Sequence, residues 1–374
     1  MQMWIKACVT SPKYSINFNG ESIGFFAGAK GLRQGDPMSP YLFVLIMDSL
    51  SQLLQHNIQR SPVFRYHWKC NKLSLSHLCF ADDLTLLFHG DVQSAALMKL
   101  TLSQFYDFTG LQANPTKSCL FLAGLEDDVA ESICQILQFP KGSLPMKYLG
   151  VPLITSRLKK VHCDDLVNRI SSRILSWTSK FLSYAGRIQL IQSVLNGIFN
   201  YWSGMFILPK YILKQVECLM RRFLWTGGIE KGHGAKVAWA KVCMPKKEGG
   251  LGFKNLTQMN CILNLKHIWA LFAKDNASLW SQWIHVYMLK NRSFWSIKPP
   301  SQCSWYWRKL LKLRDMVRPV LKHRIGNGCG TFLWYDNWHP LGPLLVKFPP
   351  RVAYDAGLPL NAKVDNIIAN GEWQ

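Results

Sequence analysis

Two adjacent aspartates, Asp82 and Asp83, lie between two short apolar runs, residues 78–81 and 84–88. Apolar runs on either side of a polar turn are typical of a β-hairpin, so the sequence predicts a buried hairpin with its acidic turn exposed. Two carboxylates this close repel each other, and burying them is costly. A divalent cation removes that cost, because carboxylate oxygens are ligands that Mg²⁺ prefers. The alternative is a turn whose aspartates are simply solvated.

A loop rich in glycine and proline precedes a predicted helix. Residues 31–40 read GLRQGDPMSP, and leucines and isoleucine recur at helical spacing over residues 41–54. The glycines allow positive φ or close backbone approach, and the prolines stiffen the chain as it enters the helix. Bare backbone together with Arg33 and Gln34 at a helix N-terminus suits bases and phosphates. A plain loop that caps a helix remains the alternative.

The charge of the chain favours a polyanionic partner. Its 374 residues carry 44 Lys and Arg against 22 Asp and Glu, a net charge of +22. Residues 151–260 alone hold 17 basic and 5 acidic side chains. Such a surplus attracts phosphate-bearing partners, although basic residues that merely solvate a surface remain the alternative. An anionic membrane is a weaker interpretation, because the basic residues are dispersed and no apolar run approaches the length of a membrane span.

The cysteines and histidines predict no metal centre. Eleven cysteines are an odd number without any Cys-x-x-Cys pair, which is typical of reduced thiols in a reducing compartment. Cys243, Cys261 and His267 lack zinc spacing and are more simply core or surface residues. The N-terminus shows no basic segment followed by an apolar stretch and a cleavage site, so we do not expect secretion.

The chain divides by pattern into residues 1–125, 126–260 and 261–374. The first stretch mixes helix and strand signals. The second is mainly helical, with three apolar stripes: Leu166, Ile170, Ile174 and Trp177; Ile188, Ile191, Leu195 and Ile198; Val216, Leu219, Phe223 and Leu224. Its arginines fall off the stripes, which predicts helices that are apolar inside and basic outside: Arg169, Arg173, Arg187, Arg221 and Arg222. The third stretch is rich in tryptophan, for which core packing is favoured over stacking on bases.

Four motifs follow one another in order. Residues 31–40 hold Arg33, Gln34, Gly35 and Pro37; residues 80–83 read FADD; residues 110–118 read GLQANPTKS and include Lys117; residues 147–153 read KYLGVPL and include Tyr148, Leu149 and Gly150. In this order they resemble motifs B, C, D and E of the reverse transcriptases of non-LTR, LINE-type retrotransposons, particularly the plant-type branch. Further stretches at 182–187, 208–209, 248–252 and 334–338 are similar to the family's thumb and to the region that follows it.

The resemblance implies a fold of class α+β and an activity. Residues 1–125 would be a polymerase palm with a ferredoxin-like core that lacks its first strand. A mainly helical, basic thumb and a Trp-rich C-terminal region would follow. The activity implied is RNA-directed DNA synthesis by two-metal nucleotidyl transfer, with an RNA template, a DNA primer and dNTPs as partners and Mg²⁺ or Mn²⁺ as cofactor.

The resemblance also assigns site residues. Asp82 and Asp83 would bind the metal ions, and Lys117 would assist the pyrophosphate leaving group. Four residues of motif B would contact template and nucleotide: Arg33, Gln34, Gly35 and Pro37. Three residues of motif E would form the primer grip: Tyr148, Leu149 and Gly150. We expect an intracellular protein, nuclear or cytoplasmic, and nothing in the sequence sets its oligomeric state.

One expected element is missing. Family palms use a third carboxylate from motif A, upstream of motif B, yet Glu21 is the one acidic residue before Gly31. We therefore expect a fragment that starts after motif A and is inactive or very weak alone. Two other hypotheses stay open. The chain is either a remnant that binds nucleic acid without chemistry, or a decayed element without a selected function.

Overall fold

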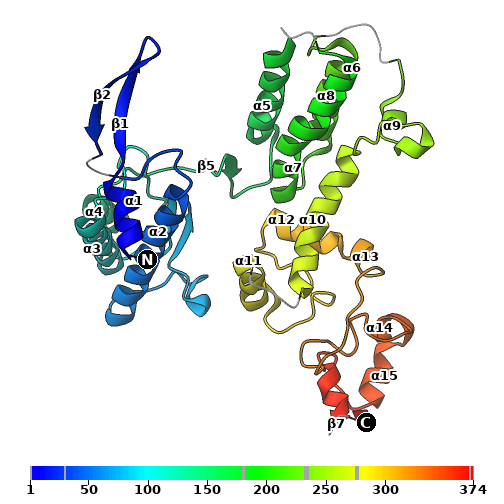
Figure 1. Ribbon diagram of the computed structural model, residues 1–374. Coiled ribbons are helices and arrows are strands. Elements are labelled where there is room, and N and C mark those ends of the chain that lie inside the picture. The colour runs from blue at the N-terminus through cyan, green and yellow to red at the C-terminus, as the bar shows by residue number, and fades with distance from the viewer. Residues whose placement is uncertain are drawn as a thin grey trace. The chain divides into compact units, whose positions relative to one another are not determined.

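The computed structural model describes residues 2–28, 31–178, 182–230, 236–273, 278–369 and 372–373. The chain forms two compact units, Met1–Ser143 and Leu144–Gln374, and each is described by itself. Helices dominate both units, and the strands pair only into small two-stranded sheets (Figure 1). The expected α+β class is confirmed at this level. The division into three stretches made from the sequence stays a prediction.

The first unit begins with exposed elements. They are the helix α1 (Gln2–Thr10) and the antiparallel hairpin of β1 (Lys13–Phe18) and β2 (Glu21–Ala27). None of their described side chains is buried, and Trp4 and Phe25 are 78% and 75% exposed. The hairpin therefore depends on its own cross-strand contacts, among them the stacked rings of Tyr14 and Phe26.

Three helices form the core of the first unit: α2 (Ser39–Arg60), α3 (Val92–Thr109) and α4 (Asp127–Leu137). Their apolar faces meet in one cluster that includes Leu54, Met98 and Ile133, each fully buried. Burying side chains of this size stabilises the fold by about 1.5–3 kcal/mol each. The helix predicted at residues 41–54 is confirmed, and it continues to Arg60.

The boundaries of α3 follow from its sequence. Asp91 is the N-cap, and its carboxylate accepts a hydrogen bond from the backbone N–H of Ser94 at 2.8 Å. Gly110 follows the last turn with φ +72°, the left-handed conformation that ends many helices. Two further segments complete this unit, the 3₁₀ turn Asn71–Leu73 and the hairpin of β3 (His77–Phe80) and β4 (Asp83–Leu86).

The second unit opens with the hairpin of β5 (Met146–Tyr148) and β6 (Val151–Leu153) and continues as a helical bundle. The bundle comprises α5 (Lys160–Thr178), α6 (Tyr184–Leu190), a π-helical turn (Ile191–Leu195), α7 (Asn196–Met205) and α8 (Lys210–Thr226). All three predicted stripes face its core, where Ile170, Leu195 and Phe223 are fully buried. The helical prediction for this stretch is confirmed.

The basic exterior predicted for these helices is only partly correct. Arg169 and Arg173 are exposed, whereas Arg187 and Arg222 are half-buried. Arg187 donates to the carbonyl of Leu224 at 3.4 Å, and Arg222 donates to that of Ile229 at 3.2 Å. Leu224 lies in the last turn of α8, whose carbonyls have no partner within the helix, and Ile229 follows the end of α8, so the two guanidinium groups satisfy carbonyls that the helix leaves unpaired.

The long helix α10 (Leu256–Phe272) contacts α12 and α13, and Leu333, Ala353 and Val364 belong to a separate apolar cluster in the rest of the second unit. The rest of this unit includes α9 (Trp239–Val242), Lys246–Glu248, α11 (Leu279–Trp283), Ile284–Leu289, α12 (Trp305–Lys312), α13 (Arg314–Val317), α14 (Leu344–Lys347), α15 (Pro350–Asp355), Val364–Ile367, β7 (Ile368–Ala369) and β8 (Glu372–Trp373). Trp295, Trp307 and Trp334 are buried, which confirms core packing for these three. None of the described helices has the length and hydropathy needed to cross a bilayer.

Candidate nucleic-acid site

The acidic pair lies at the tip of the β3–β4 hairpin. Phe80 pairs with Asp83, so the turn consists of Ala81 and Asp82, and Ala81 takes a φ of +52°. Both aspartates are exposed, as predicted, and among the described residues neither carboxylate has an ion-pair or hydrogen-bond partner. A tight turn therefore presents two free carboxylates side by side in the chain.

The strands of this hairpin differ in burial. Leu84 and Leu86 of β4 pack against the core of the first unit. On β3, Leu78 and Phe80 are 37% and 61% exposed, which corrects the expectation of a buried hairpin on both strands. The physical reason is the register: Leu78 and Phe80 lie opposite Thr85 and Asp83, on the face of the hairpin that points away from Leu84 and Leu86 and from the core. The apolar side chains of β3 are thus left without a covering element.

A hydrogen bond fixes the base of the hairpin. His77 begins β3, and its Nε2 lies 3.0 Å from the hydroxyl of Ser51 on α2, while its Nδ1 lies 3.0 Å from the hydroxyl of Ser76. Burial lowers the pKa of His77, because it disfavours the charged ring. The hairpin is therefore held to the helical core at its base, and its acidic tip projects away from that attachment.

The acidic tip is suited to only part of a metal site. Free carboxylate oxygens fit a hard divalent cation, and Mg²⁺ demands about six oxygen ligands in octahedral geometry. The described part of the chain contains no group of three or more His, Cys, Asp or Glu side chains placed to hold a metal ion. Asp82 and Asp83 therefore fit such a cation as two ligands of a larger set.

Hydrogen bonds between side chains and backbone groups hold the loop of residues 31–38. Asp36 accepts a hydrogen bond from the N–H of Met38 at 2.8 Å, and the hydroxyl of Ser39 donates to the carbonyl of Arg33. Gly35 has a φ of +89°, a conformation that side chains rarely adopt. These contacts leave Arg33, Gln34, Gly35 and Pro37 exposed in front of α2.

Lys117 lies in an exposed turn between α3 and α4. Asn114 builds this turn, because its side-chain oxygen accepts from the backbone N–H of Thr116 at 2.9 Å and from its hydroxyl at 2.7 Å. The N–H of Lys117 then bonds to the carbonyl of Asn114 at 3.1 Å. The backbone of the turn is thus fixed, while the lysine side chain is exposed without a described partner.

The β5–β6 hairpin is attached to helices of the second unit. Its turn residues Leu149 and Gly150 have φ values of +50° and +77°. Tyr201 of α7 donates a hydrogen bond to the carbonyl of Leu149. On the preceding strand, Lys147 forms an ion pair with Asp165 of α5 at 2.7 Å. This turn is therefore positioned by side chains that the sequence motifs did not identify.

Arg169 is another residue that the motifs missed. Its guanidinium lies against Gly150, so that a Cβ added there would be 3.1 Å from the terminal nitrogen. Its one signal in the sequence is its place off the apolar stripe of α5, which it shares with Arg173. The structure thus locates Arg33, Gln34, Gly35, Pro37, Asp82, Asp83 and Lys117 in the first unit and Tyr148, Leu149 and Gly150 in the second.

Comparison with known proteins agrees with these motifs. The family described as reverse transcriptase (RNA-dependent DNA polymerase) matches residues 1–153, a stretch that ends with the last residue of β6. A putative ribonuclease H protein of Arabidopsis thaliana is 36% identical over 200 residues, which cover 52% of this chain and 32% of that protein. An uncharacterized mitochondrial protein of the same plant is 29% identical over 149 residues, 38% of this chain and 96% of that protein.

A relative from an insect extends the comparison. The retrovirus-related Pol polyprotein from a type-2 retrotransposable element of Drosophila melanogaster is 26% identical over 268 residues. The match covers 68% of this chain and 24% of that polyprotein. The chain thus spans about a third of the plant ribonuclease H protein and about a quarter of the polyprotein. Residues 1–153 therefore match the reverse transcriptase family, and 268 residues of the chain are similar to the Pol polyprotein of a type-2 retrotransposable element.

Proposed function

We propose that this chain is part of an RNA-directed DNA polymerase of a non-LTR retrotransposon, with its first unit as the palm and the α5–α8 bundle as the thumb. The observation that carries the proposal is the tip of the β3–β4 hairpin, where Asp82 and Asp83 are exposed and have no described partner. Reverse transcriptases generally use divalent cations and nucleic-acid substrates. Magnesium or manganese would supply electrostatic stabilisation of the reacting phosphate there.

The other motif residues take further roles in the proposed reaction. We assign Arg33, Gln34, Gly35 and Pro37 to template and incoming nucleotide, since their loop presents bare backbone and donors at the start of α2. Lys117 is assigned to the leaving pyrophosphate, because its ammonium is exposed on a fixed turn. The turn at Tyr148, Leu149 and Gly150 is assigned to the primer.

A missing ligand limits the activity of the 374 residues by themselves. Two carboxylates form an incomplete set, and β3 pairs with β4 alone among the described residues, so its other backbone edge is where a further strand would pair. We infer that this strand brings the third carboxylate and completes the ferredoxin-like core. Loss of one ligand puts several kcal/mol of transition-state stabilisation at risk, and about 1.4 kcal/mol is already tenfold in rate.

Primer extension tests this proposal. The purified 374-residue chain is incubated with an RNA template, an annealed DNA primer, dNTPs and Mg²⁺ or Mn²⁺. We expect no synthesis above the level of Asp82→Asn, with Asp107→Asn, an exposed aspartate on α3, as the matched control. Robust synthesis that disappears in Asp82→Asn and persists in Asp107→Asn would overturn the inferred need for a further strand.

Binding without chemistry is the second candidate function. The exposed Arg169 and Arg173 on α5 and the basic surplus over residues 151–260 favour it. If the thumb contacts phosphates, the logarithm of the affinity for a primer–template falls linearly with the logarithm of salt concentration, by about 0.9 per phosphate contacted on B-form DNA. A flat salt response, or no binding at low salt, excludes this binding function. It also contradicts the polymerase proposal, because a polymerase must bind its primer–template.

A further inference from the structure

An arginine of the second unit lies against the turn of the β5–β6 hairpin. The guanidinium of Arg169, on α5, is so close to Gly150 that a Cβ added to the glycine would lie 3.1 and 3.3 Å from its two terminal nitrogens. Gly150 also has a φ of +77°, a conformation that residues with side chains rarely adopt. Glycine at this position therefore leaves room for the guanidinium beside the turn.

The positive charge of Arg169 has no partner in the described part of the chain. Asp165 lies one turn earlier on α5, at the spacing from which helical ion pairs form. Its carboxylate instead pairs with Lys147 of β5 at 2.7 Å. Arg169 forms no ion pair or hydrogen bond through its side chain with any described residue. Its N–H donors are thus available at an exposed position.

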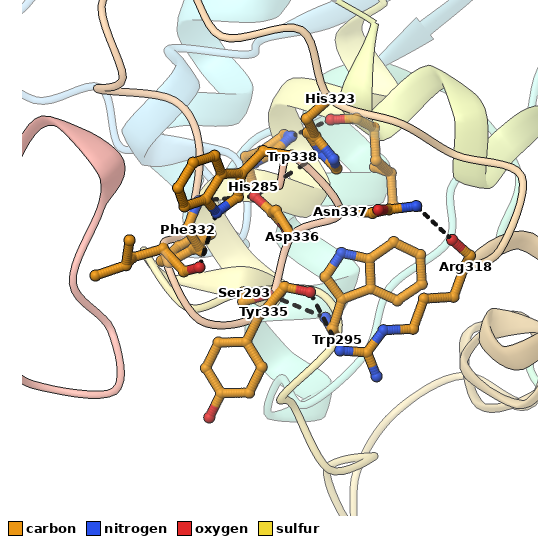
Figure 2. Close-up of polar contacts among 12 residues, drawn as sticks. His285, Ser293, Trp295, Arg318, His323, Phe332, Tyr335, Asp336, Asn337 and Trp338 are labelled. Atoms are coloured by element: carbon orange, nitrogen blue, oxygen red, sulfur yellow. Dashed lines mark hydrogen bonds and ion pairs between the residues drawn. The ribbon is translucent and has the colours of Figure 1, made fainter. Parts of the chain in front are cut away.

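Two other arginines of this unit have a structural role and differ from Arg169 in their contacts. Arg314 is half-buried and donates to three backbone carbonyls, at 2.9, 3.1 and 3.0 Å. Arg318, also half-buried, donates to the carbonyl of Tyr335 at 3.1 Å and lies over the ring of Trp295, 5.5 Å from its centroid (Figure 2). Arg169 is exposed and satisfies no carbonyl among the described residues, so it does not support the fold in this way.

Further donors surround this guanidinium. Arg173 lies one turn later on the same face of α5, and it too is exposed without an ion-pair partner among the described residues. Like charges at this spacing repel each other, and a bound anion removes that repulsion. In the turn, the N–H groups of Leu149 and Gly150 have no acceptor among the described residues. The turn and this face of α5 therefore offer positive charge and donors to an anion.

We propose that Arg169 binds a backbone phosphate of the primer strand, and that Arg173 binds a neighbouring phosphate of the same strand. A guanidinium presents two parallel N–H donors, which match two oxygens of a phosphate. The turn beside Arg169 is the one assigned to the primer, so this inference rests on the proposed function and adds the groups that bind the strand. A side chain at Gly150 would push the guanidinium away from this position.

Binding of a primer–template by the full 374-residue chain tests the role of Arg169. Fluorescence anisotropy measures the affinity for an RNA template with an annealed DNA primer over a series of salt concentrations. Arg169→Gln should weaken binding about tenfold at low salt, the effect of one lost charge-assisted contact. It should also reduce the slope of log affinity against log salt by about one. Arg324→Gln removes the same charge from an exposed position of the same unit, outside α5, and should leave both values unchanged.

A scan of the phosphates identifies the strand that Arg169 contacts. Uncharged methylphosphonate linkages replace single phosphates, one position at a time, in the primer and in the template. At one linkage of the primer, the replacement should weaken binding by wild type about tenfold. The same replacement should hardly affect Arg169→Gln, because the contact is already absent there. A purely structural effect of Arg169→Gln would instead persist with every linkage.

Gly150→Ala is the second variant. Its Cβ displaces the guanidinium and also strains the turn, but only the displacement depends on Arg169. We therefore expect Gly150→Ala to weaken primer–template binding more in wild type than in the Arg169→Gln variant. Equal losses in the two backgrounds would contradict the role assigned to this glycine.

Three results would overturn the proposal. They are equal affinities and salt slopes for Arg169→Gln and Arg324→Gln, a coupled phosphate in the template strand, and no coupled phosphate in either strand. Each of these leaves the polymerase proposal intact, because wild type still binds the primer–template. No binding by wild type at low salt would contradict the polymerase proposal itself, and the contact of Arg169 with the primer would be excluded with it.

Discussion

The hydroxyl of Tyr201 donates a hydrogen bond to the backbone carbonyl of Leu149, a residue 52 positions earlier in the chain. It links the middle of α7 to the turn of the β5–β6 hairpin. Leu149 lies in the turn between the paired residues Tyr148 and Val151, so its carbonyl is outside the strand ladder and meets the helix. Side chains of α5 and α7 therefore attach the turn assigned to the primer to the helical bundle.

Replacing Tyr201 with Phe should weaken this attachment without disturbing the core. The lost hydrogen bond is expected to lower the free energy of unfolding by about 0.5–1 kcal/mol, a modest value because the tyrosine is partly exposed. Urea denaturation followed by circular dichroism measures the change. Tyr354→Phe, at a side chain that is 85% exposed, is the matched control and should have no effect. Equal stabilities of the two variants would show that the contact contributes nothing.

A larger effect is expected at Asn264 of α10. Its amide nitrogen donates to the carbonyls of Ser203 at 3.0 Å and Asn260 at 2.6 Å, and its oxygen accepts from the hydroxyl of Tyr306 at 2.8 Å. Asn264→Ala leaves these buried groups unpaired, so we expect a loss of about 2–4 kcal/mol in the free energy of unfolding. Gln258→Ala, exposed on the same helix, should cost less than about 0.5 kcal/mol. A cost for Asn264→Ala as small as that of the control would contradict the network.

The buried carboxylate Asp336 predicts a pH dependence of stability. Burial raises its pKa above the ordinary 3.8, and nearby His323 and Arg318 oppose that shift only in part. The folded state therefore holds this proton more tightly than the unfolded chain. The contribution to stability is complete below pH 3.8 and declines as the pH rises through the folded-state pKa.

Asp336→Asn removes that titration while keeping an acceptor for the N–H of Phe332. Urea unfolding from pH 4 to pH 7 should show wild type losing stability relative to the variant as the pH rises. The opposite trend, with wild type gaining, would mean that pairing with His323 and Arg318 outweighs burial. Asp107→Asn, at an exposed carboxylate, should show no such divergence from wild type.

Cys163 should be inert in the folded protein. It is fully buried on α5, and burial, aided by Asp164, raises its pKa from 9.0 to about 12. Its thiolate fraction at neutral pH is then about a thousandfold below that of an ordinary cysteine, and the thiolate is the reactive form. Mass spectrometry after brief treatment with iodoacetamide should find the exposed Cys119 labelled and Cys163 unlabelled until urea is added. Labelling of both at similar rates in buffer would contradict this burial.

Local pattern predicted much of the fold. The stripes of α5 and α8 were visible because helical periodicity and burial coincide there, as at Ile170 and Phe223. The turn at Asp82 was visible because a polar pair interrupts two apolar runs. Contacts between distant segments left no such trace. No sequence pattern identifies Tyr201 as the partner of Leu149, or Arg187 as a cap of α8. Each contact joins residues that come close only when the bundle folds.

The exposure of β3 escaped prediction for a different reason. Alternation and hydrophobicity indicate that a strand prefers burial, but they do not say whether another element covers the face that carries its apolar side chains. Leu78 and Phe80 have the composition of a covered strand and are exposed. The apolar side chains of β3 are exposed, and the metal site proposed at the tip of the hairpin has two carboxylates where three are expected. Both observations support the proposal of an additional strand.

Complementation of the acidic hairpin tests the central claim most directly. A reverse transcriptase strand that carries the motif A aspartate is fused before residue 1, and primer extension on an RNA template with Mg²⁺ is compared with that of the 374-residue chain. We predict DNA synthesis by the fusion and none above background by the 374-residue chain alone. Synthesis by the fusion should be lost with Asp82→Asn and retained with Asp107→Asn. A folded fusion that binds primer–template yet extends nothing, or one whose synthesis survives Asp82→Asn, would contradict the assignment of this hairpin to a polymerase metal site.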